Sequence, residues 1–221
     1  MKHSLPLLAC ALALPLFACT DEPSVEATIT PLACGRLTCE LDRPLAVGSH
    51  LAFQSQPLGI VASARVSDAT LATVTAGFLQ AEDAYTVNGL APGRVTIELL
   101  DEHGDVVGAR ELEIAAADHL EATVTLVGAS GTSQLDRVVA DQPQPVPASA
   151  VARVSVDQRR GADPLNGWSE YTFEPTLTNG ARVIRWDREG NATIDLRAGE
   201  QSVRFVSTAT SLGATFVLAA R

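Results

Sequence analysis

Few side chains in this sequence combine a reactive group with the spacing that catalysis needs. Of its four histidines, His50, His103 and His119 lie beyond the amino-terminal segment, and none belongs to a His-x-x-x-His or HExxH metal-binding pair. Ser130 lies in the run GASGTS, which lacks the Gly-x-Ser-x-Gly spacing of a nucleophile elbow. The sequence therefore predicts no catalytic residue, no metal site and no cofactor, and it favours a protein that is not an enzyme.

Carboxylates gather in two predicted turns. Asp101, Glu102 and Asp105 belong to the run DEHGD, and Asp187 and Glu189 belong to the run DREGN. Calcium takes about six to eight oxygen ligands, which carboxylates at loop tips can supply in part. Neither run has the Asp-x-Asp-x-Asp-Gly series of calcium loops, so solvated hairpin turns are the preferred interpretation.

Aromatic side chains are scarce, at 5% of the residues, yet Trp168, Tyr171, Phe173 and Trp186 occur close together in the second half of the chain. In exposed positions such residues stack on sugar rings or anchor a protein partner. Residues 168–173 are equally typical of a core strand, and core packing is the preferred interpretation. If the protein binds a ligand or partner through these aromatic residues, Trp168, Tyr171 and Trp186 are the candidate contacts.

The amino terminus has the pattern of a secretory signal peptide. Lys2 is followed by an apolar run from Leu5 to Ala18, and polar residues begin directly after Cys19. The run is shorter than the ~20 residues that span a bilayer, and no later segment is apolar for as long. We therefore expect removal of residues 1–18 and no membrane-spanning helix in the mature chain.

The segment Leu16-Phe17-Ala18-Cys19 resembles the lipobox of bacterial lipoproteins, in which an aliphatic residue stands three places before a cysteine and a small residue directly precedes it. Phe17 departs from the small or β-branched residue usual at its place. The resemblance implies that the Cys19 thiol is diacylated, that residues 19–30 form a lipidated tether, and that membrane lipid is a partner through Cys19. Several acyl chains anchor a protein stably, because each buried methylene contributes about 0.8 kcal/mol.

Two of the four cysteines remain for another role, since Cys10 leaves with the signal peptide and Cys19 carries the lipid. In an exported protein, a remaining pair such as Cys34 and Cys39 usually forms a disulfide. A ring this small stabilises a local turn by about 2 kcal/mol. The alternative is a metal or redox site, which is disfavoured because two thiols and the nearby His50 fall short of the ligand set of a structural zinc.

Composition excludes several classes of protein. The formal net charge is -10, with 46% hydrophobic and 19% charged residues. This balance argues against intrinsic disorder and against a basic nucleic-acid-binding surface, so nucleic acid is not an expected partner. A chain of 221 residues has room for two modest domains at most.

Alternation of apolar and polar residues dominates the remaining sequence and is typical of half-buried strands. Turn sequences such as Asn179-Gly180 separate the alternating stretches at the spacing of short antiparallel strands. The sequence therefore predicts an all-β protein made of two tandem antiparallel β-sandwiches. The clearest alternating stretches are residues 94–99, 109–114, 121–126 and 202–206.

Residues 44–115 resemble the group-2 bacterial immunoglobulin-like domain, in which an Ala-Thr-Val strand is followed by a Val-x-Gly-Leu-x-x-Gly-x-x-x-Ile corner and a closing strand of alternating Val or Ile. The resemblance implies an immunoglobulin-like sandwich. At the corner we expect positive φ at Gly89 and Gly93, and Leu90 filling the bottom of the core. Two departures are the long connection 77–84 and the missing Trp of the preceding strand. The matching positions are Ala72, Thr73, Val74, Val87, Gly89, Leu90, Gly93, Ile97, Leu112 and Ile114.

The predicted domains are the signal peptide, the tether, an immunoglobulin-like sandwich over residues 31–117 and a second β-sandwich over residues 118–221. The proline-rich run from Ala140 to Ala150 favours extended polyproline structure. It is either a loop inside the second sandwich or the linker between domains. The loop is preferred, because a boundary there would leave a second core of marginal size.

Together these features predict a membrane-anchored envelope lipoprotein that serves as a non-catalytic binding, spacing or assembly module. The anchor places it in the bacterial cell envelope, with the outer membrane favoured over the inner, and either periplasmic or surface-exposed. An envelope protein or a cell-wall glycan is the expected partner besides lipid. The alternative is a carbohydrate-binding or small hydrolytic protein with its site in the second domain.

Overall fold

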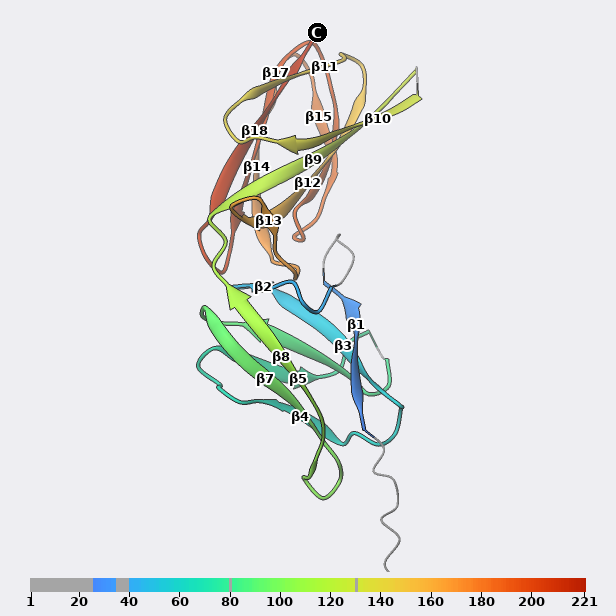
Figure 1. Cartoon of the computed structure of the whole chain (residues 1–221). Helices are drawn as coiled ribbons and strands as arrows, with labels where there is room; N and C mark the ends of the chain where they lie inside the picture. Colours follow the sequence, from blue (N-terminus) through green and yellow to red (C-terminus); the bar gives the residue numbers. More distant parts are fainter. Residues whose placement is uncertain (1–25, 35–39, 80, 130) are drawn as a thin grey trace, which may run out of the picture.

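The structure is a computed structural model that describes residues 26–34, 40–79, 81–129 and 131–221. These residues form two β-sandwiches joined end to end, which confirms the predicted all-β class (Figure 1). The described chain enters at the end of the first sandwich that lies away from the second, and its carboxyl terminus lies at the far end of the second (Figure 1). In these described ranges, no helix is long and apolar enough to cross a membrane.

The first sandwich consists of two four-stranded sheets with the orders β1-β3-β6-β5 and β2-β8-β7-β4. This is the strand order of an immunoglobulin constant-type domain, with β2 added at one edge. Its neighbouring strands are antiparallel except β2, which runs parallel to β8. The bounds are β1 (Thr28–Ala33), β2 (Leu45–Ala46), β3 (His50–Gln56), β4 (Ser63–Val66), β5 (Ala72–Ala76), β6 (Ala84–Gly89), β7 (Gly93–Leu100) and β8 (Val106–Ala115).

The second sandwich repeats this strand order. Its sheet β9-β12-β16-β15 corresponds to β1-β3-β6-β5, and its sheet β11-β18-β17-β14 corresponds to β2-β8-β7-β4. Two additions distinguish it, because β10 pairs with the outer edge of β9 and the short β13 pairs with the end of β12. The bounds are β9 (His119–Gly128), β10 (Gly131–Val138), β11 (Pro143–Val146), β12 (Val151–Arg160), β13 (Asp163–Pro164), β14 (Tyr171–Thr176), β15 (Arg182–Trp186), β16 (Asn191–Asp195), β17 (Gly199–Ser207) and β18 (Gly213–Ala220).

Each sandwich encloses its own core, built from the apolar face of the alternating strands. On β7, Val95, Ile97 and Leu99 are buried, as the alternation predicts. On β17, Val203 and Phe205 are buried in the same way. Burying one such side chain contributes about 1.5–3 kcal/mol, so the alternating pattern fixes which face of each strand turns inward.

The corner after β6 differs from the sequence-based expectation. Leu90 is 49% exposed and does not fill the core, whereas Leu45 on β2 is fully buried. Gly89 does not adopt a positive φ. A glycine is needed there for close packing, because a Cβ at this position would lie 3.0 Å from the Ala46 carbonyl oxygen and 3.1 Å from Cγ2 of Ile114.

The proline-rich run supplies a strand of the second sandwich. Residues Pro143–Val146 form β11, which pairs in parallel with residues 217–220 of β18. Proline is tolerated there because β11 is an edge strand, where one side of the backbone needs no ladder partner. The polypeptide passes from one sandwich to the other between Ala115, the end of β8, and His119, the start of β9.

Candidate functional site

The connection between β12 and β14 holds the two sandwiches together. It spans residues 161–170, whereas the equivalent connection of the first sandwich, between β3 and β4, spans only residues 57–62. Within the longer connection, Asn166 forms a parallel bridge with Leu45, and Trp168 forms an antiparallel bridge with His50. This connection, residues 161–170, is called here the inserted segment. It extends the strand pairing of the first sandwich.

Asn166 fixes this segment by hydrogen bonds that cross the junction. The residue is fully buried. Its backbone N–H donates to the Pro44 carbonyl at 2.8 Å. Its side-chain Nδ2 donates to the carbonyls of Glu40 and Arg43 at 2.6 and 2.8 Å. Such bonds in a water-excluded contact hold the sandwiches in a defined relative position.

A buried polar cluster lies beside these contacts and joins β12, the inserted segment and the first sandwich. The hydroxyls of Ser49 and Ser169 lie 2.5 Å apart. Nε2 of Gln158 donates to both, at 3.0 Å to Ser49 and 2.5 Å to Ser169. The other end of the same amide, Oε1 of Gln158, is buried without a hydrogen-bond partner.

A cavity of about 380 Å³ lies at this junction and is called here the junction cavity. A volume of that size falls in the range of about 300–1,000 Å³ typical of small-molecule sites. Both sandwiches contribute to its wall: the end of β1 and the β5–β6 connection from the first, and β12, the inserted segment, β14 and the β15–β16 turn from the second. The lining residues are Ala33, Cys34, Phe78, Leu79, Val156, Asp157, Gln158, Leu165, Gly167, Trp168, Ser169, Tyr171, Glu189 and Asn191.

Trp168 contributes an aromatic ring to this wall. Its ring centroid lies 5.7 Å from that of His50 and 5.6 Å from that of Phe78, both in tilted arrangements. The backbone of Trp168 exchanges hydrogen bonds with His50, at 2.8 and 3.0 Å. The indole is therefore held at a fixed place by two rings of the first sandwich, and it remains partly exposed.

Tyr171 is buried and lines the cavity from β14. Burial is the largest cause that raises the pKa of its hydroxyl to about 12, and the negative charge of Asp157 raises it further. Hydrogen bonds with the side chains of Gln158 and Ser169 lower this pKa in part. One face of its ring packs on Gly190, where a Cβ would come within 3.0 Å of the ring and 2.4 Å of Cγ2 of Val156. The Tyr171 ring therefore needs a glycine at position 190.

The charged residues of the described lining are acidic. Asp157 and Glu189 carry carboxylates, and the described residues of the wall include no lysine, arginine or histidine. The β15–β16 turn that presents Glu189 is shaped by Asp187, whose Oδ1 accepts hydrogen bonds from the backbone N–H groups of Glu189 and Asn191 at 3.0 Å each. An anionic ligand would meet repulsion in this cavity.

Trp186 lies apart from the junction cavity. It belongs to β15 and its ring stacks on Phe173 at 5.6 Å, closing an edge of the second core. It is 45% exposed. Of the aromatic contacts predicted from the sequence, the structure thus brings Trp168 and Tyr171 to one cavity and leaves Trp186 elsewhere.

The cysteine predictions fall partly outside the described residues. Cys34 is buried and lines the junction cavity. Cys39 and the lipidation site Cys19 lie outside the described ranges. The Cys34–Cys39 disulfide and the acylation of Cys19 therefore stay predictions.

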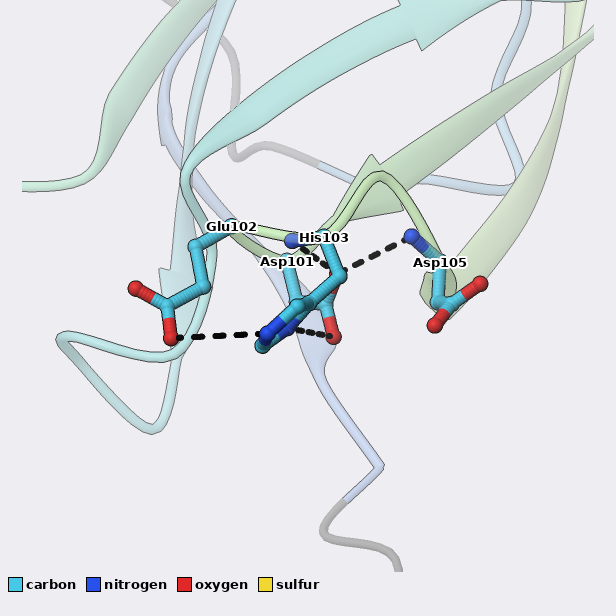
Figure 2. Close-up of polar contacts among 4 residues, drawn as sticks. All are labelled: Asp101, Glu102, His103 and Asp105. Carbon is cyan, nitrogen blue, oxygen red and sulfur yellow. Dashed lines mark hydrogen bonds and ion pairs between the residues drawn. The ribbon is translucent and has the colours of Figure 1, made fainter.

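The acidic turn DEHGD closes the β7–β8 hairpin, and Figure 2 shows its side chains. Oδ1 of Asp101 accepts hydrogen bonds from the backbone N–H groups of His103 and Asp105, at 2.9 Å each. These bonds, with that of Asp105 the largest cause, hold the pKa of the Asp101 carboxyl below its ordinary value. The carboxylate stabilises its own turn, and the described residues contain no group of three or more His, Cys, Asp or Glu that could hold a metal ion.

Sequence reasoning missed most of the cavity wall. Phe78, Asp157 and Gln158 were not singled out, because they come from separate parts of the sequence and only the contact between sandwiches brings them together. One signal was present: Gln158 interrupts the inward face of an otherwise apolar strand, which marks a polar group buried for a reason. The long connection 77–84, noted as a departure from the immunoglobulin-like pattern, carries Phe78.

No protein-family model and no curated protein matches the chain. Among solved structures, the chain is similar to domains 5–6 of the S-layer protein SbsC, with 14% identity, a TM-score of 0.32, and coverage of 86% of this chain and 99% of that one. It is also similar to the Escherichia coli adhesin FdeC, with 15% identity, a TM-score of 0.31, and coverage of 89% of this chain and 65% of that one.

A third similar structure is SGBP-B from the mixed-linkage glucan utilization locus of Bacteroides ovatus, in complex with a mixed-linkage heptasaccharide. The identity is 11% and the TM-score 0.35, and the match covers 84% of this chain and 46% of that one. Similarities this distant carry no argument about a site, so the function must be argued from the junction cavity itself.

Proposed function

We propose that this chain is a lipid-anchored, non-catalytic binding module of the bacterial cell envelope, with the junction cavity as its ligand site. The supporting observation is the cavity itself, in which Trp168, Tyr171 and buried polar groups converge between two closely packed sandwiches. Concave sites at domain interfaces, apolar with a few placed polar groups, are where proteins commonly bind small ligands.

The hydrogen bonding of the cavity supports binding over nucleophilic catalysis. Ser169 is 1% exposed. Its hydroxyl is engaged with Ser49, with Gln158 and with the Gly48 carbonyl, to which it donates at 3.1 Å. A serine nucleophile needs an adjacent base such as histidine, and the nearby His50 places its Nδ1 against Oδ1 of Asn88 instead.

The proposed anchor would keep the module close to the bilayer. The stretch from Cys19 to Thr28, where β1 begins, spans at most about 30 Å when extended. Replacement of the acylated cysteine, Cys19→Ala, is expected to move the protein from the membrane fraction to the soluble fraction. The matched control is Cys10→Ala, within the predicted signal peptide, which should leave the protein membrane-bound. Continued membrane attachment of Cys19→Ala would refute the anchor.

The binding role is tested by capture from envelope extract on the immobilised full chain. Wild type and Trp186→Ala are expected to retain the same envelope component, whereas Trp168→Ala should lose it, because only Trp168 lines the cavity. The two substitutions remove the same side chain, so their difference isolates the site. Equal retention by both variants, or none by wild type, would contradict the proposed function.

A second candidate function is hydrolysis of a glycan in the same cavity. It is favoured by one observation, that Asp157 and Glu189 both line the wall, since glycoside hydrolysis commonly uses two carboxyl groups. Release of reducing sugar from an envelope glycan by wild type, with loss of this activity in Glu189→Gln, would replace the binding proposal by this one.

A further inference from the structure

We infer that the junction cavity binds an uncharged sugar ring, with an apolar face of the ring on the Trp168 wall and a hydroxyl donating to Gln158. The inference rests on the proposed function and specifies its ligand. It follows from the charge, the hydrogen-bonding groups, the apolar wall and the size of the cavity.

The charge of the described wall disfavours an acidic ligand. Asp157 and Glu189 are part of the described wall, which holds no cationic side chain to balance a phosphate, sulfate or carboxylate. An anionic ligand held near these two acidic residues without a cationic partner would lose hydration and meet repulsion. Uronic and sialic acids are disfavoured on the same ground, which favours neutral or cationic ligands.

The hydrogen-bond acceptors of the wall favour a ligand that carries hydrogen-bond donors. Carboxylates only accept hydrogen bonds, and Oε1 of Gln158 is an acceptor that is buried without a partner. An unmade hydrogen bond of this kind is costly, and a ligand hydroxyl that donates to it removes the cost. A quaternary ammonium has no donor and would leave this oxygen unpaired.

The apolar wall and the volume of the cavity favour a compact ligand with one hydrophobic face. Trp168, Phe78 and Leu165 contribute apolar surface beside the acceptors. The C–H face of a pyranose packs on such side chains while its hydroxyls point sideways to polar groups. A cavity of about 380 Å³ at the junction is at the small end of ligand sites, which suits one or two rings and not a long chain.

The geometry at Trp168 is preformed. His50 and Phe78 flank the indole, and backbone hydrogen bonds to His50 fix its position before any ligand arrives. Binding therefore costs little ordering of this side chain, and the affinity gained from its apolar surface is retained.

The test is a titration of the full chain, kept in a detergent without a sugar headgroup, with the methyl glycosides of glucose, galactose, mannose and N-acetylglucosamine. Choline and methylamine are the cationic probes. The chain has two tryptophans, so the Trp186→Phe variant makes Trp168 the sole indole reporter of fluorescence. Saturation-transfer NMR gives the dissociation constants for Trp168→Ala, Trp168→Phe and the control Trp186→Ala.

At least one glycoside should bind and change the fluorescence of Trp168. Trp168→Ala is expected to weaken that binding about tenfold or more, Trp168→Phe less, and Trp186→Ala by less than about twofold. If Trp168→Ala does not fold, as judged by its thermal unfolding, Trp168→Phe and the sole-tryptophan reporter carry the test.

Three results would overturn the inference. Binding of a glycoside that is unchanged in Trp168→Ala would place the sugar elsewhere. Binding of choline or methylamine in a Trp168-dependent manner, without any glycoside, would reject sugar as the ligand class and leave the proposed binding function intact. Absence of binding by every probe would also reject the sugar, whereas the proposed function fails only if the capture experiment shows no dependence on Trp168.

Discussion

His50 and Trp168 exchange backbone hydrogen bonds of 2.8 and 3.0 Å across the junction between the two sandwiches, with their rings 5.7 Å apart. His50 begins β3, and β1 pairs with that strand only from Ala52 onward. Trp168 therefore takes the place beside β3 that β1 does not reach. One backbone pairing thus both joins the sandwiches and sets a wall of the junction cavity.

Asn166→Ala is expected to destabilise the protein by about 2 kcal/mol, because the carbonyls of Glu40 and Arg43 lose the Nδ2 donor in a buried contact. Urea unfolding monitored by circular dichroism measures the change. Gln134→Ala, which removes an exposed hydrogen bond to Asp136, is the control and should change stability by less than about 0.5 kcal/mol. A neutral Asn166→Ala would mean that the junction contributes nothing to stability.

Gly190→Ala and Gly180→Ala form a matched pair. Both glycines have positive φ, +83° and +78°, but a Cβ at Gly190 would meet Val156 and Tyr171, whereas one at Gly180 meets nothing within 4 Å. We expect about 1 kcal/mol of destabilisation at Gly180 from backbone strain alone. At Gly190 overpacking adds about 1–3 kcal/mol more. Equal destabilisation of the two variants in thermal unfolding would show that the ring of Tyr171 moves aside without cost, which would contradict the prediction.

Tyr171 should ionise only in strong alkali. In a Tyr85→Phe variant the single remaining tyrosine is expected to titrate near the pKa of about 12 that its burial produces. A tyrosine pKa raised by folding stabilises the native state fully below the unfolded pKa of about 10, and this stabilisation is lost as pH rises through the folded pKa. Ultraviolet absorbance of tyrosinate follows the titration, and an ordinary pKa would contradict the burial of this hydroxyl.

Asp101 should contribute to acid sensitivity. Its carboxyl pKa is lowered by hydrogen bonds from the backbone amides of Asp105 and His103. The stabilisation is therefore present above the ordinary carboxyl pKa of about 3.9 and is lost as pH falls through the lower folded pKa. In Asp101→Asn, the melting temperature should depend less on pH in this acidic range than in wild type. An unchanged pH dependence would remove Asp101 from the acid response.

The predicted pairing of Cys34 with Cys39 is tested by thiol labelling of the exported, lipidated protein under denaturant. No label is expected, because Cys10 is absent, Cys19 carries lipid and the other two thiols are oxidised. After reduction the label should appear on Cys34 and Cys39. Labelling before reduction would show that these thiols are free.

The sequence predicts those elements that are half-buried. On β7, β9 and β17, every second residue contacts a core, so the alternation records the burial directly. The prediction for the corner at Gly89 and Leu90 is wrong, because a glycine needed for close approach to Ala46 and one needed for positive φ look the same in a sequence.

The candidate site could be predicted only in part. Trp168 and Tyr171 stood out because aromatic residues are rare in this chain. That Trp168 and Tyr171 line the junction cavity and Trp186 does not could not be predicted from the sequence, because it depends on which side of the second sandwich faces the first. Asp157 and Phe78 became part of one wall only through a contact between residues that are far apart along the chain.

The direction of β1 has a mechanical consequence. The strand starts at the end of the first sandwich away from the second (Figure 1). Its last residue, Ala33, lines the junction cavity. A pull between the amino terminus and an occupant of the cavity would run along this strand of about 20 Å. The hydrogen bonds that join β1 to β3 lie across the pull. They would bear the load together in shear.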